Sequence, residues 1–178
     1  MSWNPFRPPS RSGAEWFPVG LASDFPDVGD DSEEAEVHDG AVVHARSCGD
    51  DKTVTKPGCK VFHVPKDDIS KRTEVAVSAA EPEAETDLTD QVMVFRYRGK
   101  MHAVDHQCPH SSYPLSKGVP FDIEDFGIVL SAGITCPKHS WSFDLFSGRS
   151  DRGNYKLKVW EAEVRGEEVW VRRKPRMG

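Results

Sequence analysis

Hydrophobic residues recur along the chain in short runs that are typical of β-strands rather than helices. Four segments carry such strand patterns: 15–22 (EWFPVGLA), 60–64 (KVFHV), 91–106 (QVMVFRYRGKMHAVDH) and 155–173 (YKLKVWEAEVRGEEVWVRR). No long stretch has the apolar spacing of an amphipathic helix. The pattern therefore predicts an all-β fold.

The third and fourth segments each contain two β-rich runs separated by a short turn. The turns are Arg98-Gly99-Lys100 and Arg165-Gly166-Glu167. A glycine between two strand patterns is typical of a β-hairpin. In the last segment Val164, Val169 and Val171 alternate with charged residues, which indicates strands with one face in water.

The length of 178 residues fits one domain with insertions. Residues 66–90 are acidic, poor in aromatic residues and contain Glu-Pro-Glu, so we predict a flexible insertion there. Residues 24–40 are similar. Residues 1–14, which contain three prolines, are predicted to be a disordered tail, and 175–178 a second tail. The folded domain would then span 15–174.

Charge and hydropathy narrow the classes of partner. The net charge is −6, and the acidic residues are concentrated in segments 24–40 and 66–90. We interpret these segments as solvated loops; the alternative is a docking surface for a basic partner. Nucleic acid is not expected, because the dense basic run is confined to 172–176. No run approaches the roughly 20 apolar residues of a membrane span. We expect a cytoplasmic protein; a mitochondrial transit segment in the acid-free residues 1–14 is the alternative.

Two short segments pair a cysteine with a histidine. Cys108 and His110 lie in CPHSSYPLSKG, and Cys136 and His139 lie in CPKHSW. The spacing is C-x-H, 25 residues, then C-x2-H. In zinc fingers the cysteines usually come together and the histidines together, whereas here each segment has one of each. Such mixed segments suit a 2Fe-2S cluster in which the cysteines hold one iron and the histidines the other; a zinc site is the alternative.

This motif resembles that of the Rieske iron-sulfur proteins. Further segments resemble parts of that family in the same order: 16–29, 94–110, 114–118 and 134–150. The resemblance covers residues 15–174. It implies an antiparallel β-sandwich with a small cluster-binding subdomain of two loops, and one 2Fe-2S cluster per chain. It further implies that Cys108 and Cys136 bind the buried iron and that His110 and His139 bind the outer one.

The chain departs from the family pattern in two places. Residues 119–133 look like an insertion beside the cluster, and are a candidate for determining partner choice. Ser140 stands where the family usually has glycine. This weakens the expectation of a tight backbone approach there, because serine tolerates most such conformations except a positive φ.

Residues around the motif indicate the redox potential. Rieske proteins of respiratory and photosynthetic complexes have a disulfide between the loops, and here Tyr113 and Lys138 stand at those positions. Those proteins also place serine and tyrosine hydroxyls against the cluster, where this chain has Trp141 and Phe143. The resemblance is therefore to the low-potential branch, the Rieske-type ferredoxins and oxygenase domains, with a potential near about −150 mV rather than about +300 mV.

Other candidate residues have ordinary interpretations. Cys48 and Cys59 are predicted to be ordinary thiols rather than further ligands, and His106 a strand residue rather than an alternative ligand. Trp141, Phe143 and Phe146 are expected to form core and cluster cover, with an electron exit through Trp141 as the alternative. Four further histidines carry no argument: His38, His44, His63 and His102.

Three functions are compatible with these features. The one we expect is an electron carrier that passes single electrons from a flavin or NAD(P)H-linked reductase to an acceptor such as an oxygenase, with no catalysis of its own. A Rieske component of an oxidoreductase or oxygenase complex is the second; an oxygenase would need an additional iron site of two histidines and a carboxylate. A structural metal-binding interaction protein is the third. The sequence does not identify the donor, the acceptor or the oligomeric state.

Overall fold

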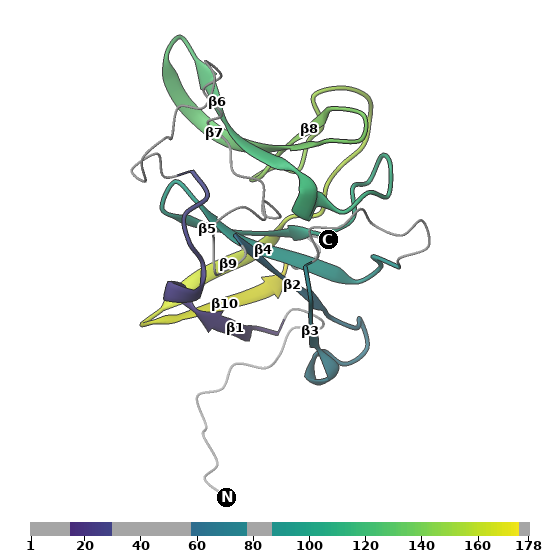
Figure 1. Ribbon diagram of the computed structural model, residues 1–178, viewed down its shortest axis with the longest axis vertical. Helices are drawn as coiled ribbons and strands as arrows, with labels where there is room; N and C mark the ends of the chain where they lie inside the picture. Colours follow the sequence, from purple (N-terminus) through teal and green to yellow (C-terminus); the bar gives the residue numbers. More distant parts are fainter. Residues whose placement is uncertain (1–14, 30–57, 78–86, 175–178) are drawn as a thin grey trace, which may run out of the picture.

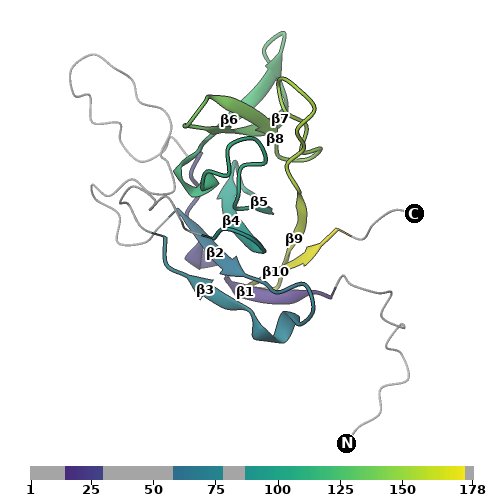
Figure 2. The same ribbon diagram turned by 90° about the vertical axis from the view of Figure 1, so that its right-hand side faces the viewer.

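A computed structural model describes residues 15–29, 58–77 and 87–174. These residues form strands in three antiparallel sheets, with only short 3-10 turns of helix, as Figures 1 and 2 show. The all-β prediction is confirmed. The predicted tails at 1–14 and 175–178 lie outside the described residues, as do Cys48, His38 and His44 and most of the segment 24–40.

The first sheet has the order β1-β10-β9. It contains β1 (Phe17–Leu21), β9 (Trp160–Arg165) and β10 (Glu168–Arg173), and the short helix η1 (Ala22–Asp24) follows β1. The turn between β9 and β10 has Gly166 at φ 62°, so the predicted hairpin is confirmed. Val169 and Val171 point into the core, whereas Val164 is exposed.

The second sheet has the order β3-β2-β4-β5. It contains β2 (Cys59–His63), β3 (Thr73–Val75), β4 (Gln91–Tyr97) and β5 (Lys100–Asp105). In the turn between β4 and β5, Arg98 and Gly99 have φ values of 50° and 74°. Two left-handed residues make the tight turn that matches strand twist, which confirms the second predicted hairpin.

The predicted flexible insertion at 66–90 is wrong for its first part. Residues Ile69–Lys71 form the short helix η2. Asp68 caps this helix, and its carboxylate accepts the Ser70 N–H at 3.0 Å. Strand β3 then pairs with β2 at the edge of the sheet. The local cap and the strand pairing outweigh the acidic composition of this segment. Residues 78–86 lie outside the described part of the chain.

The third sheet has the order β6-β7-β8 and carries the second Cys-His segment. It contains β6 (Val119–Asp125), β7 (Ile128–Cys136) and β8 (Trp141–Asp144), preceded by the short helix η3 (Leu115–Lys117). The predicted insertion at 119–133 is therefore a hairpin, β6–β7, which projects from the top of the molecule in Figures 1 and 2.

Strand β4 is buried on both faces and joins two parts of the core. Val92 and Val94 face the side chains of the first sheet, including those of β1 and β10. Met93 and Phe95 face the third sheet. This alternation follows from the two-residue period of a strand. The first two sheets thus form the sandwich, and the third sheet forms the predicted subdomain above it.

Candidate metal centre

The first Cys-His loop follows β5 and runs from His106 to η3. The Cys108 N–H donates to the Tyr113 carbonyl at 2.9 Å, and the Ser112 N–H donates to the Cys108 carbonyl at 2.9 Å. These bonds fold Cys108-Pro109-His110 into a compact loop. The Leu115 N–H donates to the His106 carbonyl at 2.8 Å and closes its base.

The second Cys-His loop joins β7 to β8 and has a similar construction. Cys136 is the last residue of β7 and lies opposite Trp141, the first residue of β8. The Ser140 N–H donates to the Cys136 carbonyl at 3.0 Å. In both loops, therefore, the residue four places after the cysteine closes a turn onto the cysteine carbonyl.

Both closing serines have left-handed backbone conformations. The φ angle is 55° at Ser112 and 57° at Ser140. The sequence argument that serine would avoid a positive φ at position 140 is therefore wrong. The turn onto the Cys136 carbonyl imposes the conformation, and serine adopts it although only glycine does so without strain.

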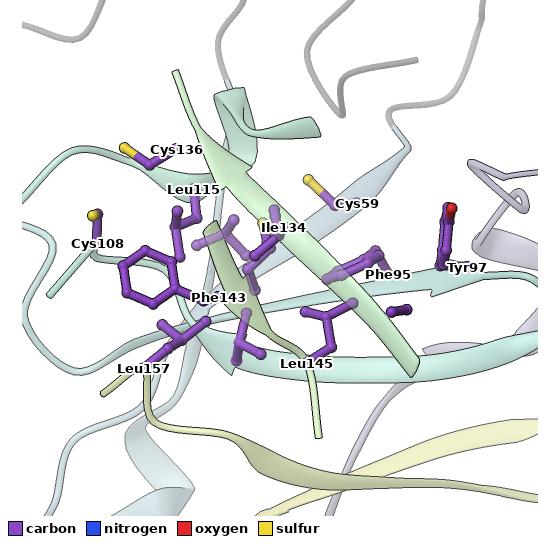
Figure 3. Packing of buried hydrophobic residues seen from close by; sticks show 14 residues of the cluster. Cys59, Phe95, Tyr97, Cys108, Leu115, Ile134, Cys136, Phe143, Leu145 and Leu157 are labelled. Carbon is purple, nitrogen blue, oxygen red and sulfur yellow. The ribbon is translucent and has the colours of Figure 1, made fainter. Parts of the chain in front are cut away.

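The two cysteines lie together at one end of the core, as Figure 3 shows. Cys108 and Cys136 are fully buried, with Leu115 and Phe143 in the same apolar cluster. Hydrogen bonding between the two thiols lowers the pKa of Cys108 and raises the pKa of Cys136, because one proton is held between them. The pair is thus a preformed, water-excluded thiolate site.

The two histidines lie closer to the surface than the cysteines. The ring centroids of His110 and His139 are 5.2 Å apart. His139 is exposed, whereas His110 is partly covered and its Nδ1 atom is buried without a hydrogen-bond partner among the described residues. A buried polar atom with no partner is costly, and a metal ion would satisfy it. The structure therefore brings the four predicted ligands to one place as two pairs.

This donor set does not converge on one point. In the described part of the chain, no group of three or more His, Cys, Asp or Glu side chains is arranged to hold a single metal ion. Two thiols beside each other and two imidazoles nearer the surface are the donors that a binuclear iron-sulfur cluster with mixed ligands requires. The residues present therefore fit such a cluster.

Comparison with known proteins decides the family. Residues 59–161 match the Rieske [2Fe-2S] domain model. The chain belongs to this family. It therefore binds one 2Fe-2S cluster, as the mixed Cys-His loops predict. The four predicted ligands lie inside the matched range.

Individual relatives resemble parts of this Rieske chain. Human apoptosis-inducing factor 3 is 32% identical over 85 residues, which cover 46% of this chain and 12% of that protein. The ferredoxin component of the alkene monooxygenase system of Xanthobacter autotrophicus is 27% identical over 86 residues, 48% of this chain and 64% of that protein. The chain thus matches less than two thirds of the length of either relative.

The fold is shared with a crystal structure solved as a candidate NADH-dependent nitrite reductase small subunit from Mycobacterium tuberculosis. The TM-score is 0.52 at 16% identity, and the similarity covers 91% of this chain and 97% of that chain. This confirms the predicted Rieske fold. Separately, none of the described helices has the length and hydrophobicity needed to cross a membrane.

Aromatic side chains cover His110, the less exposed of the two histidines in the Rieske motif. The rings of Trp141 and His110 are stacked, with centroids 3.9 Å apart and planes 13° apart. Tyr155 meets His110 edge-on at 5.2 Å, and the Arg152 guanidinium lies 5.7 Å from the Trp141 ring. Trp141 thus covers the His110 ring, whereas nothing in the sequence pattern marked Tyr155 or Arg152.

A serine that sequence reasoning missed lies against a cysteine sulfur. The Ser111 Oγ is 3.5 Å from the Cys136 Sγ, which joins one loop to the other. The resemblance considered only the positions of Trp141 and Phe143, which carry no hydroxyl, and gave no role to Ser111. Phe143 is buried as expected. Ser111 follows the first histidine directly, and only the folded arrangement of the two loops shows which sulfur it contacts.

The positions of the missing disulfide are also close together. The Lys138 Nζ lies 6.0 Å from the centroid of the Tyr113 ring, a cation–π contact between the loops. Such contacts contribute about 0.5–1 kcal/mol at exposed sites. They restrain the two loops less than a covalent bond would.

His106 was predicted to be a strand residue, but it lies in the bend directly after β5, where its ring has structural contacts. Its Nδ1 is 2.8 Å from Gln91 Oε1 and its Nε2 is 2.8 Å from Ser116 Oγ, so both ring nitrogens are occupied. Burial lowers the pKa of His106 to about 4, which keeps the ring neutral. The imidazole therefore fastens the first loop to β4 and η3.

The remaining candidates lie away from the four predicted ligands. Cys59 is buried on β2, and Figure 3 places it apart from the Cys108–Cys136 pair. His63 is on β2, and His102 on β5 is buried, stacked on Phe95 and in edge contact with Phe146. Phe146 is half-exposed rather than core, which corrects that prediction.

Proposed function

We propose that the chain is a one-electron carrier and that Cys108, Cys136, His110 and His139 hold its cluster. The cysteines would bind the buried iron and the histidines the outer one. The observation that carries the proposal is the arrangement of the donors. Two adjacent thiols have no access to water, and beside them lies the buried His110 Nδ1, which lacks a hydrogen-bond partner among the described residues. Bound there, the cluster supplies reversible one-electron transfer.

The cysteines and the histidines would have different roles: the cysteines would retain the cluster, and His139 would pass the electron to a partner. The buried thiolates keep the cluster bound, because the surrounding core excludes water. His139 is exposed and so offers the shortest contact between the cluster and a partner protein. Trp141 and Tyr155 cover His110, so we assign the electron exit to His139 rather than to Trp141.

The potential is proposed to lie in the lower part of the Rieske range. Hydrogen bonds to the sulfurs stabilise the extra negative charge of the reduced state. Phe143 and Trp141 provide no hydroxyl, and Ser111 provides a long contact of 3.5 Å. We therefore expect a value nearer about −150 mV than about +300 mV. Such a value suits a flavin or NAD(P)H-linked donor.

The relatives support a carrier that serves an enzyme system. One of them is the ferredoxin component of an alkene monooxygenase system. On that basis we propose an acceptor of the oxygenase class and a separate reductase as donor. The alternative, in which the chain is a fixed component of an oxidoreductase complex, would require a stable association with the catalytic subunit.

Metal analysis and electron paramagnetic resonance of the purified full-length chain test the ligand assignment. We expect iron and labile sulfide in equal amounts, and the rhombic signal of mixed ligation after reduction with dithionite. Cys108→Ser should abolish both. Cys59→Ser is the matched control, because Cys59 is buried in the same core cluster but apart from the pair. Zinc without sulfide in the wild type, or a full cluster in Cys108→Ser, would contradict the assignment.

Reduction kinetics test the carrier function. A flavin-dependent NADH:ferredoxin reductase should reduce the cluster rapidly, and the reduced chain should transfer its electron to cytochrome c within one turnover. If His139 is the exit, a bulky modification of its exposed ring should slow the transfer without changing the iron content. A cluster that these partners neither reduce nor oxidise would favour the structural role instead.

A further inference from the structure

The tip of the β6–β7 hairpin exposes a set of large apolar side chains. We define the hairpin tip as Glu124–Leu130. Within it the side chains of Phe126, Ile128, Val129 and Leu130 are 98%, 64%, 55% and 65% exposed. Three consecutive apolar residues of β7 are thus in water on both faces of the strand, although a strand at a surface normally alternates. Contiguous exposed apolar side chains of this kind indicate an interaction site.

The turn residue of the tip is unfavourable for the fold. The two-residue turn between Asp125 and Ile128 has φ values of 49° at Phe126 and 76° at Gly127. Such a turn favours asparagine, aspartate or glycine at its first position. Phenylalanine is strained there and gains no burial. A residue that violates a local rule without a structural gain is expected at a functional site.

The charge around the tip restricts what can cover it. No lysine, arginine or histidine occurs from Val119 to Pro137, and Glu124 and Asp125 are exposed beside the apolar residues. The third acid, Asp122, is already paired with Arg98 at 2.9 Å. An anionic membrane surface would repel this tip. Two tips packed against each other would bring like charges together. A complementary surface must therefore be apolar with basic residues at its rim.

The same chain carries such a surface in another place. A pocket of about 280 Å³ lies between the start of β5 and β9, and we call it the β5–β9 pocket. Its apolar lining consists of Met101, Phe146, Ala162 and Val164. Phe146 and Val164 are half-exposed, so the pocket is accessible.

The charged groups of the β5–β9 pocket complement the tip. Lys100 is exposed, with its Nζ 5.6 Å from the centroid of the Phe146 ring, and Arg96 lines the wall. The Arg96 guanidinium donates to the Ala22 carbonyl at 3.0 Å. The one carboxylate in the lining, Glu163, is paired with Arg165. The charge left for a ligand is positive.

We propose that the hairpin tip of one molecule docks into the β5–β9 pocket of a second copy of this chain. Phe126 enters between Phe146, Met101 and Val164, and Glu124 and Asp125 lie against Lys100 and Arg96. If each molecule inserts its tip into the pocket of the other, the two copies form a closed dimer. If the contact is made in one direction only, it continues into larger assemblies. This contact is separate from the ligands and does not depend on the proposed electron exit.

Sedimentation velocity of the full-length, cluster-containing protein over a wide concentration range tests the proposal. The sedimentation coefficient should rise with concentration. Phe126→Asn and Phe146→Ser should each weaken association by about thirtyfold, as for a buried aromatic anchor. Phe126→Asn should also leave thermal stability unchanged or increase it, because asparagine suits this turn. Leu21→Ser is the control and should have no effect, because Leu21 on β1 is 45% exposed, close to the 48% of Phe146, and lies outside both surfaces.

A charge exchange tests which surface the tip contacts. Asp125→Lys and Lys100→Glu should each weaken association, and the two together should restore it. A monomer at every concentration would overturn the proposal, as would association that Phe126→Asn leaves intact. A third outcome is that Phe126→Asn abolishes association, Phe146→Ser has no effect and the charge exchange gives no rescue. This outcome would refute the β5–β9 pocket as the surface that binds the tip. Binding of a monomeric wild type to phosphatidylcholine vesicles would assign the tip to a membrane and also overturn it.

Discussion

Replacing the left-handed serines with glycine should stabilise the protein. Ser112 and Ser140 close the two Cys-His loops with φ values of 55° and 57°. A left-handed conformation costs an L-residue roughly 1–2 kcal/mol, which glycine avoids. Glycine in turn loses about 0.5–1 kcal/mol through the greater freedom of the unfolded chain. Neither serine hydroxyl makes a hydrogen bond with another described residue. The net gain for Ser140→Gly or Ser112→Gly is therefore about 0.5–1 kcal/mol each.

Thermal unfolding of the cluster-containing protein measures this gain. For a chain of this size, the midpoint should rise by about 1–4 °C per substitution. The rate of cluster loss at a fixed temperature is a second readout, which is needed because unfolding of a protein with a bound cofactor is often irreversible. The double variant should show the sum of both gains if the loops are independent.

Ser147→Gly is the matched control for this experiment. Ser147 is an exposed serine in the loop after β8, and its φ is not positive. Glycine there should destabilise the protein, because the entropic cost remains and the Ser147 hydroxyl, which accepts the Arg149 N–H at 3.3 Å, is lost. If Ser112→Gly and Ser140→Gly also lower the midpoint, then strain at the loop serines is absent and the reasoning is refuted.

Four further substitutions probe the centre and the pH dependence. Ser111→Ala should lower the redox potential and Phe143→Tyr should raise it, each by up to about 40 mV or roughly 1 kcal/mol. Protein-film voltammetry measures both changes. Two unchanged potentials would contradict the role assigned to hydroxyl groups near the sulfurs. His139→Cys, if it assembles a cluster, should lower the potential and replace the mixed-ligand resonance spectrum; an unchanged spectrum would remove His139 from the ligand set. Burial, and secondarily the charge of Lys100, lowers the pKa of His102 to about 4. The neutral ring therefore contributes its full share to the free energy of unfolding above about pH 6.5. This share, roughly 3 kcal/mol, is lost as the pH decreases towards 4, because the unfolded chain binds the proton first. Urea unfolding of His102→Phe across this pH window should show a flatter dependence, and a slope equal to that of the wild type would refute the assignment.

The strands and the ligand loops could be predicted because their signals are local. The period of two along β4 and the glycine turns at Gly99 and Gly166 are readable without the fold. The spacing of the Cys-His motif identified the family, because the cluster requires those residue types in that order.

Features that depend on contacts distant in sequence could not be predicted. Ser111 reaches the sulfur of Cys136 only because the two loops meet, and no pattern in CPHSSYP marks that contact. Strand β3 forms because an edge of β2 is available to it, in spite of an acidic neighbourhood. The conformation of Ser140 was misjudged because the residue type argues against it, whereas the bond to the Cys136 carbonyl requires it.

The subdomain begins and ends at neighbouring points of the sandwich. The Asp105 N–H donates to the Lys158 carbonyl at 2.9 Å, and Val104 pairs with Val159. Everything between these residues, both Cys-His loops and the β6–β7 hairpin included, is thus a single insert whose two ends are held one hydrogen bond apart. An insert of this kind can change in length or sequence without displacing the strands that carry it. The segment 106–157 is therefore continuous in sequence, but its exchange as a cassette between Rieske sandwiches would also require the β4 residues that it contacts: Met93 and Phe95 in the shared core, and Gln91, which bonds His106.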